Sequence, residues 1–242
     1  MSALILKLIA AVSMAVDHMG LMLFPRAEIL RYIGRLAFPI YAFFISEGYR
    51  HTHDRVKYFL RIFLLGVLCQ IVYTVAEDEL YIGILLTFSF SIAIMACFSL
   101  FKRTVAKSDE VVLDKEGRTV GQVLAALLCV VSVGAAYFVS ANITVDYGFS
   151  GIMLPVICSV TDNKPVRLAL FSVGLAAVAL EYAFLSGTFV AADFIKQACA
   201  LAAVPLLWLY NGSRGKYRLK YFFYIFYPAH LALLYLISVV IH

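Results

Sequence analysis

Two neighbouring residues in the first apolar segment could carry acid–base chemistry. Asp17 and His18 stand in a stretch that is otherwise apolar, and Gly20 allows another helix to approach. An imidazole can act as a general base near neutral pH, and a carboxylate can hold its tautomer. Adjacent helical positions point about 100° apart, so Asp17 cannot simply clasp the His18 ring, although both can line one polar cavity. The pair is therefore a candidate catalytic site, with structural polar anchors as the alternative.

Two arginines in the second apolar segment could bind an anion. Arg31 and Arg35 lie one helical turn apart on one face, with Gly34 beside them. They could also pair with Asp17 or extend to the lipid headgroups, and the second alternative suits Arg31 better than the deeper Arg35. Pro39 is expected to kink this segment.

A basic, histidine-containing stretch follows the second segment and could hold phosphate groups. Glu47 ends the segment one turn before His51, and basic residues continue through Lys57. Arginine and lysine bind phosphate through charge-assisted hydrogen bonds. An ordinary basic loop on the cytoplasmic side of the membrane is the alternative.

The last apolar segment contains a further polar group. Tyr227 and His230 lie too deep for an interfacial aromatic belt, and Pro228 frees a backbone carbonyl nearby. A buried polar pocket accounts for them better. Ser150 stands in a Gly-x-Ser-Gly pattern, so an intramembrane serine protease that pairs Ser150 with His230 is a weaker alternative.

The composition shows which elements must position these residues. The chain has 242 residues, of which 63% are hydrophobic and 14% charged, and its mean hydropathy is +0.92. A soluble domain has about 45–50% apolar and roughly 25% charged residues, so this chain requires a bilayer. Secreted disulfide scaffolds, disordered chains and nucleic-acid-binding domains are excluded. The five cysteines occur singly without a CxxC pair, and we expect no metal site.

Long apolar runs predict an all-α polytopic membrane bundle of about nine to ten transmembrane helices, forming one domain over residues 1–242. The predicted spans are 3–24, 29–49, 57–76, 81–101, 121–140, 146–160, 166–185, 194–210 and 219–241. The sixth is short and could be broken or re-entrant. The charged stretch 102–120 is expected to be a cytoplasmic loop.

The loop charges predict the orientation of the chain in a plasma membrane. About sixteen Lys and Arg residues fall on one set of alternate loops and four on the other. The positive-inside rule places the richer set in the cytoplasm. The N-terminus is then inside and the C-terminus outside, which requires an odd number of spans.

Several motifs resemble the TraX family, and they keep their order along nearly the whole chain. They are Asp17-His18-x-Gly20, Ile33-Gly34-Arg35-Leu36-Ala37-Phe38-Pro39-Ile40, Ser46-Glu47-Gly48, Tyr147-Gly148 with Gly151, Asn211-Gly212 with Arg214-Gly215, and Tyr224-x-x-Tyr227-Pro228-x-His230-Leu231. TraX proteins are associated with N-terminal acetylation of conjugative pilin subunits. The family also looks like a distant branch of the transmembrane acyltransferases.

The resemblance implies an enzyme that transfers an acetyl group from acetyl-CoA, with His18 as its central residue. We expect His18 to be the general base or a transient acyl carrier, tuned by Asp17. Arg35, Tyr227 and His230 are the candidates for stabilising the oxyanion. The candidates for binding CoA are Arg31, Glu47, Arg50, His51, Arg55 and Lys57.

We expect an amine or hydroxyl acceptor, and the resemblance does not fix whether it belongs to a protein N-terminus, a sugar or a small amine. The expected partners are acetyl-CoA, this acceptor and the lipid bilayer, with a homodimer as an option and no nucleic acid. A secondary transporter with a proton relay is the second hypothesis, although no internal repeat is visible. A non-enzymatic assembly factor is the third.

Overall fold

The computed structural model describes residues 1–77, 80–110, 115–185, 187–217 and 219–241. Its first helices are α1 (Ala3–Met22), α2 (Glu28–Gly34), α3 (Ala37–His51), α4 (Arg55–Glu77), α5 (Ile84–Glu110) and α6 (Lys115–Asn142). They are followed by α7 (Gly148–Cys158), α8 (Lys164–Ala183), α9 (Ala191–Ala198), the 3-10 turn η1 (Cys199–Ala202), α10 (Ala203–Trp208) and α11 (Lys220–Ile241). Two short strands, β1 (Tyr81–Ile82) and β2 (Thr144–Val145), complete the fold.

The chain is a multi-pass helical membrane protein. Within the described residues, eight helical segments are long and apolar enough to cross a bilayer. They correspond to every predicted span except the sixth, which is the 11-residue helix α7. At 1.5 Å per residue α7 is only about 16 Å long, against a hydrocarbon core of about 30 Å. The prediction of an all-α polytopic bundle is confirmed.

The chain forms two compact units. Unit 1 consists of Met1–Ile45 and Val160–His242, and unit 2 consists of Ser46–Ser159. Helix α3 begins in unit 1 and ends in unit 2. The prediction of one functional domain stays a prediction.

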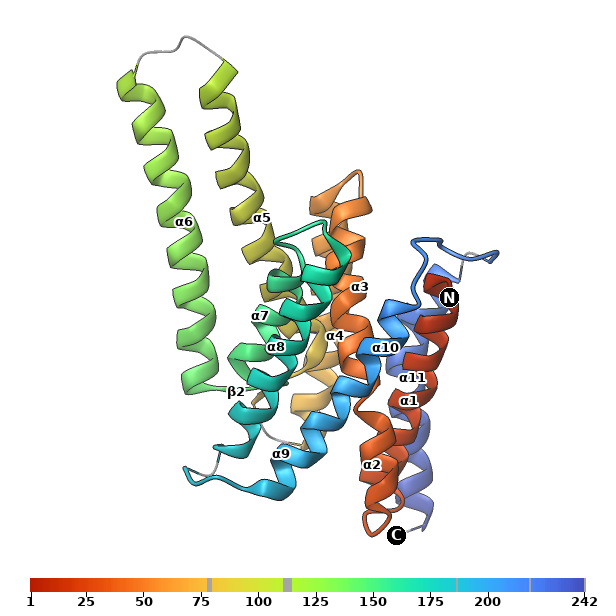
Figure 1. The fold of residues 1–242 in the computed structure, drawn as a ribbon. Coiled ribbons are helices and arrows are strands. Elements are labelled where there is room, and N and C mark those ends of the chain that lie inside the picture. Colours follow the sequence, from red (N-terminus) through yellow and green to blue (C-terminus); the bar gives the residue numbers. More distant parts are fainter. Residues whose placement is uncertain (78–79, 111–114, 186, 218, 242) are drawn as a thin grey trace. The chain divides into compact units, whose positions relative to one another are not determined.

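In unit 1, helix α1 packs against α2 and α11, and α8 packs against the α9–η1–α10 segment (Figure 1). Large apolar side chains that are fully buried form its core, and they include Leu6, Ile40, Phe43, Phe171 and Leu207. These residues come from separate helices, so the unit is assembled by contacts between segments distant in sequence.

Helices α1 and α11 run in the same direction. The chain that leads into α11 is bonded to the start of α1, because Ala3 N donates to Ser213 O at 2.8 Å. Farther along both helices, the rings of His18 and His230 are in contact. The chain ends therefore lie at opposite ends of this helix pair (Figure 1). A chain that crosses a membrane an odd number of times also has its two ends on opposite sides.

Unit 2 is built around α5, which packs against α4, α6 and α7. The strands pair in parallel, with Tyr81 opposite Thr144 and Ile82 opposite Val145. They anchor the chain where α5 and α7 begin. Tyr147 follows with a left-handed backbone (φ 63°), and this turn directs the chain into α7.

Although α7 is short, its contacts run from the strand pair to the last turn of α3. Near its start, Thr87 Oγ1 on α5 donates to Asp146 O at 3.2 Å, and Ser91 Oγ donates to Ile152 O at 2.6 Å. At its end, Arg50 Nη2 from the last turn of α3 donates to Ser159 O at 3.2 Å. Helix α7 thus runs alongside α5 from the strand pair toward the end of α3.

Two sequence predictions about local structure are wrong. The stretch 102–120 is not a loop, since α5 continues to Glu110 and α6 begins at Lys115, and residues 111–114 lie outside the described part. Good helix formers such as Lys, Arg and Ala carry both helices past their apolar parts. The second predicted span is interrupted after Gly34 and does not kink at Pro39. Pro39 is the third residue of α3, where its missing N–H leaves no intrahelical bond unmade.

Candidate functional site

The candidate site lies in unit 1, where α1 meets α2 on one side and α11 on the other. Asp17 and His18, adjacent on α1, contact different partners. This follows from the rotation of about 100° between neighbouring helical positions. Two groups of polar residues therefore meet at this part of α1. We call them the ion cluster (Asp17, Arg31, Arg35) and the histidine pair (His18, His230).

In the ion cluster, the Asp17 carboxylate lies between two guanidinium groups from α2 and its C-cap. Arg31 Nη1 donates to Oδ2 and Arg35 Nη2 donates to Oδ1, each at 2.6 Å. Arg35 Nε also donates to the Arg31 carbonyl oxygen at 3.2 Å, and Arg35 is only 5% exposed. The sequence left three roles open for these arginines: binding an anion, pairing with Asp17 or extending to the lipid headgroups. In the structure both arginines pair with Asp17.

Two glycines allow α2 to approach α1 closely enough for these bonds. A Cβ at Gly34 would overlap the Asp17 carboxylate group. A Cβ at Gly20 would lie 2.8 Å from Leu30 Cβ, which is closer than real Cβ atoms approach. The motif glycines thus set the helix spacing that the ion cluster requires.

In the histidine pair, His18 Nδ1 and His230 Nε2 are 2.9 Å apart. His230 Nδ1 lies 2.7 Å from the Phe226 carbonyl oxygen. A carbonyl oxygen only accepts, so His230 Nδ1 carries a proton and, in a neutral ring, His230 Nε2 accepts. His18 Nδ1 must then donate, and the lone pair of His18 is on Nε2. The tautomers are assigned from this bonding pattern.

Aromatic side chains of α11 fix the orientation of the His230 ring. The Phe226 ring stacks on it with centroids 4.9 Å apart and an interplanar angle of 10°. Tyr227 meets it edge-on at 5.9 Å. His230 itself is only 7% exposed, which supports the predicted buried polar pocket.

The geometry assigns different contacts from those expected for two of the predicted catalytic residues. The ring that contacts His18 is His230, whereas the Asp17 carboxylate accepts from Arg31 and Arg35. The N–H of neutral His230 is directed at Phe226 O, which makes His230 a poor oxyanion donor. The Phe226 carbonyl was not singled out in the sequence, and its only signal was the spacing of four residues before His230.

The other predicted CoA-binding residues, Glu47 to Lys57, lie in unit 2, and their described contacts are with groups of that unit. Arg50 caps the end of α7, the Arg55 guanidinium lies 4.7 Å over the Tyr49 ring, and Lys57 Nζ is 3.1 Å from Asp54 Oδ2. His51 Nδ1 is 2.9 Å from Glu47 O, and its side chain is 64% exposed.

Outside the membrane-spanning segments, the carboxyl group of Asp54 has a lowered pKa. The Lys57 backbone N–H donates to Asp54 Oδ1 at 2.9 Å and, with the Lys57 ammonium, lowers the pKa of Asp54. Asp54 thereby caps the N-terminus of α4. This is a structural role at an exposed position.

Comparison with known proteins gives a consistent set of relatives. A family model described as TraX protein matches residues 2–238. The chain is similar to the probable fimbrial assembly protein FimC, serogroup H1, of Dichelobacter nodosus, with 28% identity over 245 residues that cover 96% of this chain and 94% of that protein. It is also similar to an uncharacterized protein of Rickettsia prowazekii (strain Madrid E), with 42% identity over 71 residues, or 29% and 27% of the two chains. No solved structure matches significantly.

Proposed function

The chain belongs to the TraX family, and from this premise we propose that it is a membrane-embedded acetyltransferase. It transfers an acetyl group from cytoplasmic acetyl-CoA to an amine or hydroxyl acceptor at or across the membrane. The similarity to a fimbrial assembly protein supports an acceptor on a fimbrial or pilin subunit. We therefore take a protein N-terminal amine as the first acceptor to test.

The observation that carries this proposal is the hydrogen-bonded series from Phe226 O through His230 to His18. It presents Nε2 of His18 as a proton acceptor and holds the ring in one tautomer. This is the arrangement that a general base needs, with His230 in the place that a carboxylate takes in other enzymes.

The proposed reaction balances around that nitrogen. The acceptor nitrogen or oxygen attacks the thioester carbon while His18 Nε2 takes the acceptor's proton. The tetrahedral intermediate then collapses, the carbon–sulfur bond breaks, and His18 returns the proton to the CoA sulfur. Thioester attack places negative charge on the carbonyl oxygen, which requires preorganised donors. Arg35 and Tyr227 are the proposed donors, and His230 is the positioning residue.

The experiment uses the purified protein in phosphatidylcholine nanodiscs with radiolabelled acetyl-CoA. The probe is a short alanine–glycine peptide with a free N-terminal amine, and the same peptide with a formylated N-terminus is the control. We expect label in the free peptide only. In parallel, millimolar acetyl-CoA should raise the melting temperature, because a ligand that binds only the folded state stabilises it. Absence of both effects would reject the acetyltransferase and leave the transporter or assembly-factor hypothesis.

The proposed orientation has the N-terminus in the cytoplasm and the C-terminus outside. Termini on opposite sides are supported by the parallel course of α1 and α11, and the loop charges favour a cytoplasmic N-terminus. A reporter fused after His242 should be active only on the outer side, and one inserted within 111–114 only in the cytoplasm. Activity of both on one side would show that the chain makes an even number of crossings between them.

A further inference from the structure

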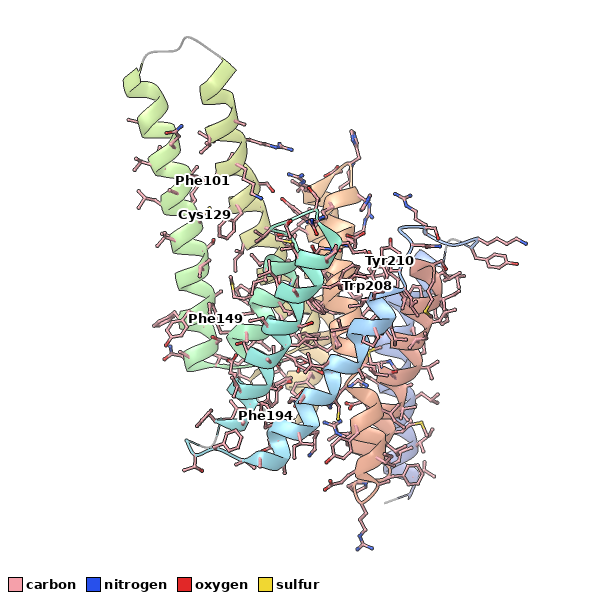
Figure 2. The ribbon with its side chains drawn as sticks, viewed as in Figure 1. Phe101, Cys129, Phe149, Phe194, Trp208 and Tyr210 are labelled. Carbon is pink, nitrogen blue, oxygen red and sulfur yellow. The ribbon has the colours of Figure 1, made fainter. Side chains whose placement is uncertain are left out.

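A cluster of cations and aromatic rings occupies the end of unit 1 where α1 begins. Its centre is formed by Phe43 and Phe44 of α3 and by Tyr210. Tyr210, labelled in Figure 2, stands just after α10. The three rings meet edge to face, with centroids 5.4 to 5.9 Å apart. Such contacts form a rigid apolar platform.

Four basic residues accompany these rings, and together with them form what we call the cation–ring cluster: Lys7, Lys164, Arg167 and Arg214. Lys7 Nζ lies 5.0 Å over the Phe44 ring, and the Arg167 guanidinium lies 4.7 Å over Phe43. Lys164 Nζ donates to the Tyr210 carbonyl oxygen at 2.7 Å. Arg214 is close enough to act electrostatically on the Lys7 ammonium.

The loop that carries Arg214 is held against α1. Asn211 N donates to Met1 O at 3.0 Å, and Ala3 N donates to Ser213 O at 2.8 Å. Gly215 has a left-handed backbone (φ 93°), and a Cβ there would lie 2.8 Å from Leu4 Cβ. The position of Arg214 is therefore built into the fold.

The described neighbours of Lys7 and Lys164 are rings and carbonyl oxygens, which carry only partial negative charge. Lys7 and Arg214 repel each other, and gathering like charges beside a membrane is favourable when an anion joins them. Phosphate groups suit the set, because lysine and arginine bind them through charge-assisted hydrogen bonds. All four residues also lie in the loop set that the positive-inside rule assigns to the cytoplasm.

Lys7 also lies on the same face of α1 as His18. The two are eleven residues apart, which is close to three full turns and about 16 Å along the axis. An extended pantetheine arm can span such a distance. A donor whose phosphates are held beside Lys7 could therefore present its thioester to His18 without leaving unit 1.

We propose that the cation–ring cluster binds phosphate groups, and that its ligand is the nucleotide end of CoA. This inference rests on the proposed acetyltransferase function. It moves the phosphate site from the predicted stretch Glu47–Lys57 of unit 2 to unit 1. In unit 2 the ammonium of Lys57 already faces the Asp54 carboxylate, whereas Lys7 in unit 1 lies over the Phe44 ring and is repelled by the Arg214 charge.

The test compares two acetyl donors in phosphatidylcholine nanodiscs: acetyl-CoA and acetylpantetheine, which lacks the nucleotide phosphates. The variant is Lys7→Gln combined with Arg214→Gln. Its KM for acetyl-CoA and its Kd for CoA should rise at least about tenfold, as expected for the loss of charge-assisted contacts. Transfer from acetylpantetheine should be unchanged. Lys216→Gln removes the same charge from the same loop, near the exposed Tyr217 ring, and should change neither donor.

Further arms keep the result interpretable. Arg214→Gln alone alters only a loop residue and should weaken CoA binding in part. Lys7→Arg keeps the positive charge and should bind CoA as the wild type does. These two results would support the site even if the double variant is unstable. Equal CoA affinity in wild type and variants, or a loss seen only with Arg55→Gln and Lys57→Gln, would overturn it. So would variants that release phosphatidylglycerol from mixed nanodiscs, measured by native mass spectrometry, without weakening CoA binding. If the wild type bound no CoA at all, the proposed function itself would fail.

Discussion

The ion cluster and the histidine pair begin at adjacent residues of α1 but satisfy their polar groups in opposite ways. In the ion cluster, two arginines surround one carboxylate at 2.6 Å, and both carboxylate oxygens are used. In the histidine pair, His18 Nδ1 donates to His230 Nε2, and His230 Nδ1 donates to the Phe226 carbonyl oxygen. Nε2 of His18 keeps its lone pair. The first arrangement joins α1 to α2, whereas the second leaves a group available for chemistry. Adjacent polar residues in a membrane helix can therefore have separate tasks, stability for one and catalysis for the other.

The largest expected effect is on catalysis at the histidine pair. His18→Ala should lower the rate of acetyl transfer by at least about 10²-fold, within the range that general bases contribute. Expression, melting temperature and acetyl-CoA affinity should change little, since the lost interaction belongs to the transition state. Initial rates and donor affinity are measured together in nanodiscs. Near-normal transfer would make His18 structural and remove the proposed mechanism.

The next effect is on stability at the ion cluster. Asp17→Ala leaves two guanidinium groups in the membrane without their carboxylate and should cost about 3–5 kcal/mol, as for other buried pairs that lose one partner. The measurement is the free energy of unfolding in detergent with a chemical denaturant. Asp17→Asn should be intermediate, because it keeps one acceptor oxygen but not the charge. If Asp17→Ala instead folded normally and lost transfer as His18→Ala does, the contrast between the two regions would fail.

Helix spacing at the ion cluster gives a smaller effect on stability. Gly34→Ala introduces a Cβ into the space of the Asp17 carboxylate and should destabilise the protein by about 1–3 kcal/mol through overpacking. Gly134→Ala in α6 is the matched control, since a Cβ there has no neighbour within 4 Å. The control should be neutral or slightly stabilising, as alanine is the better helix former. Equal melting temperatures for both variants would contradict the close approach of α1 and α2.

His230 distinguishes positioning from packing within the histidine pair. His230→Leu should lower kcat about tenfold with little change in KM for acetyl-CoA, because it removes the acceptor that holds His18 Nδ1–H. His230→Gln offers a carbonyl oxygen in its place and should restore part of the rate. Nitrogen NMR of ¹⁵N-histidine-labelled protein should assign the Nδ1–H tautomer to His18 in the wild type. An Nε2–H tautomer at His18 would contradict the assignment.

The smallest effect is expected at Asp54, an exposed counterpart of Asp17. Its pKa is lowered when the protein folds, so its contribution to stability is present above its ordinary pKa, about 3.9, and is lost as the pH falls through the lower folded value. Asp54→Ala should lower the melting temperature slightly at pH 7, with wild type and variant converging in acid. Added salt should reduce the difference at pH 7 further. If Asp54→Ala destabilised the protein as much as Asp17→Ala, the exposure of a carboxylate would not explain how much it contributes to stability.

Much of the fold was predictable because membrane spans are local in sequence. A run of about 20 apolar residues must form a helix in a bilayer, since every backbone group needs an internal partner. In the described part of the chain, eight of the nine predicted spans accordingly match helical segments long enough to cross a bilayer, and the sixth is the short helix α7. The helical ends of α5 and α6 were missed because charged residues with good helix propensity resemble a loop in a hydropathy reading. The break after Gly34 was missed because apolar character continues across it.

The sequence by itself determined which residues needed explaining. Asp17, His18, Arg35 and His230 were found from the cost of placing ionisable groups in a membrane, a cost that depends only on residue type and surroundings in the chain. Motif order along the chain also indicated the family.

Only the tertiary structure decided which of these residues contact one another. His18 and His230 are 212 positions apart, and no periodicity within either helix predicts that α1 and α11 run side by side. The partner of a side chain depends on the rotation and spacing of two helices, which glycines such as Gly34 set at the contact. For this reason the sequence identified Asp17 and His18 as one candidate pair, and the structure separated them into an ion cluster and a histidine pair.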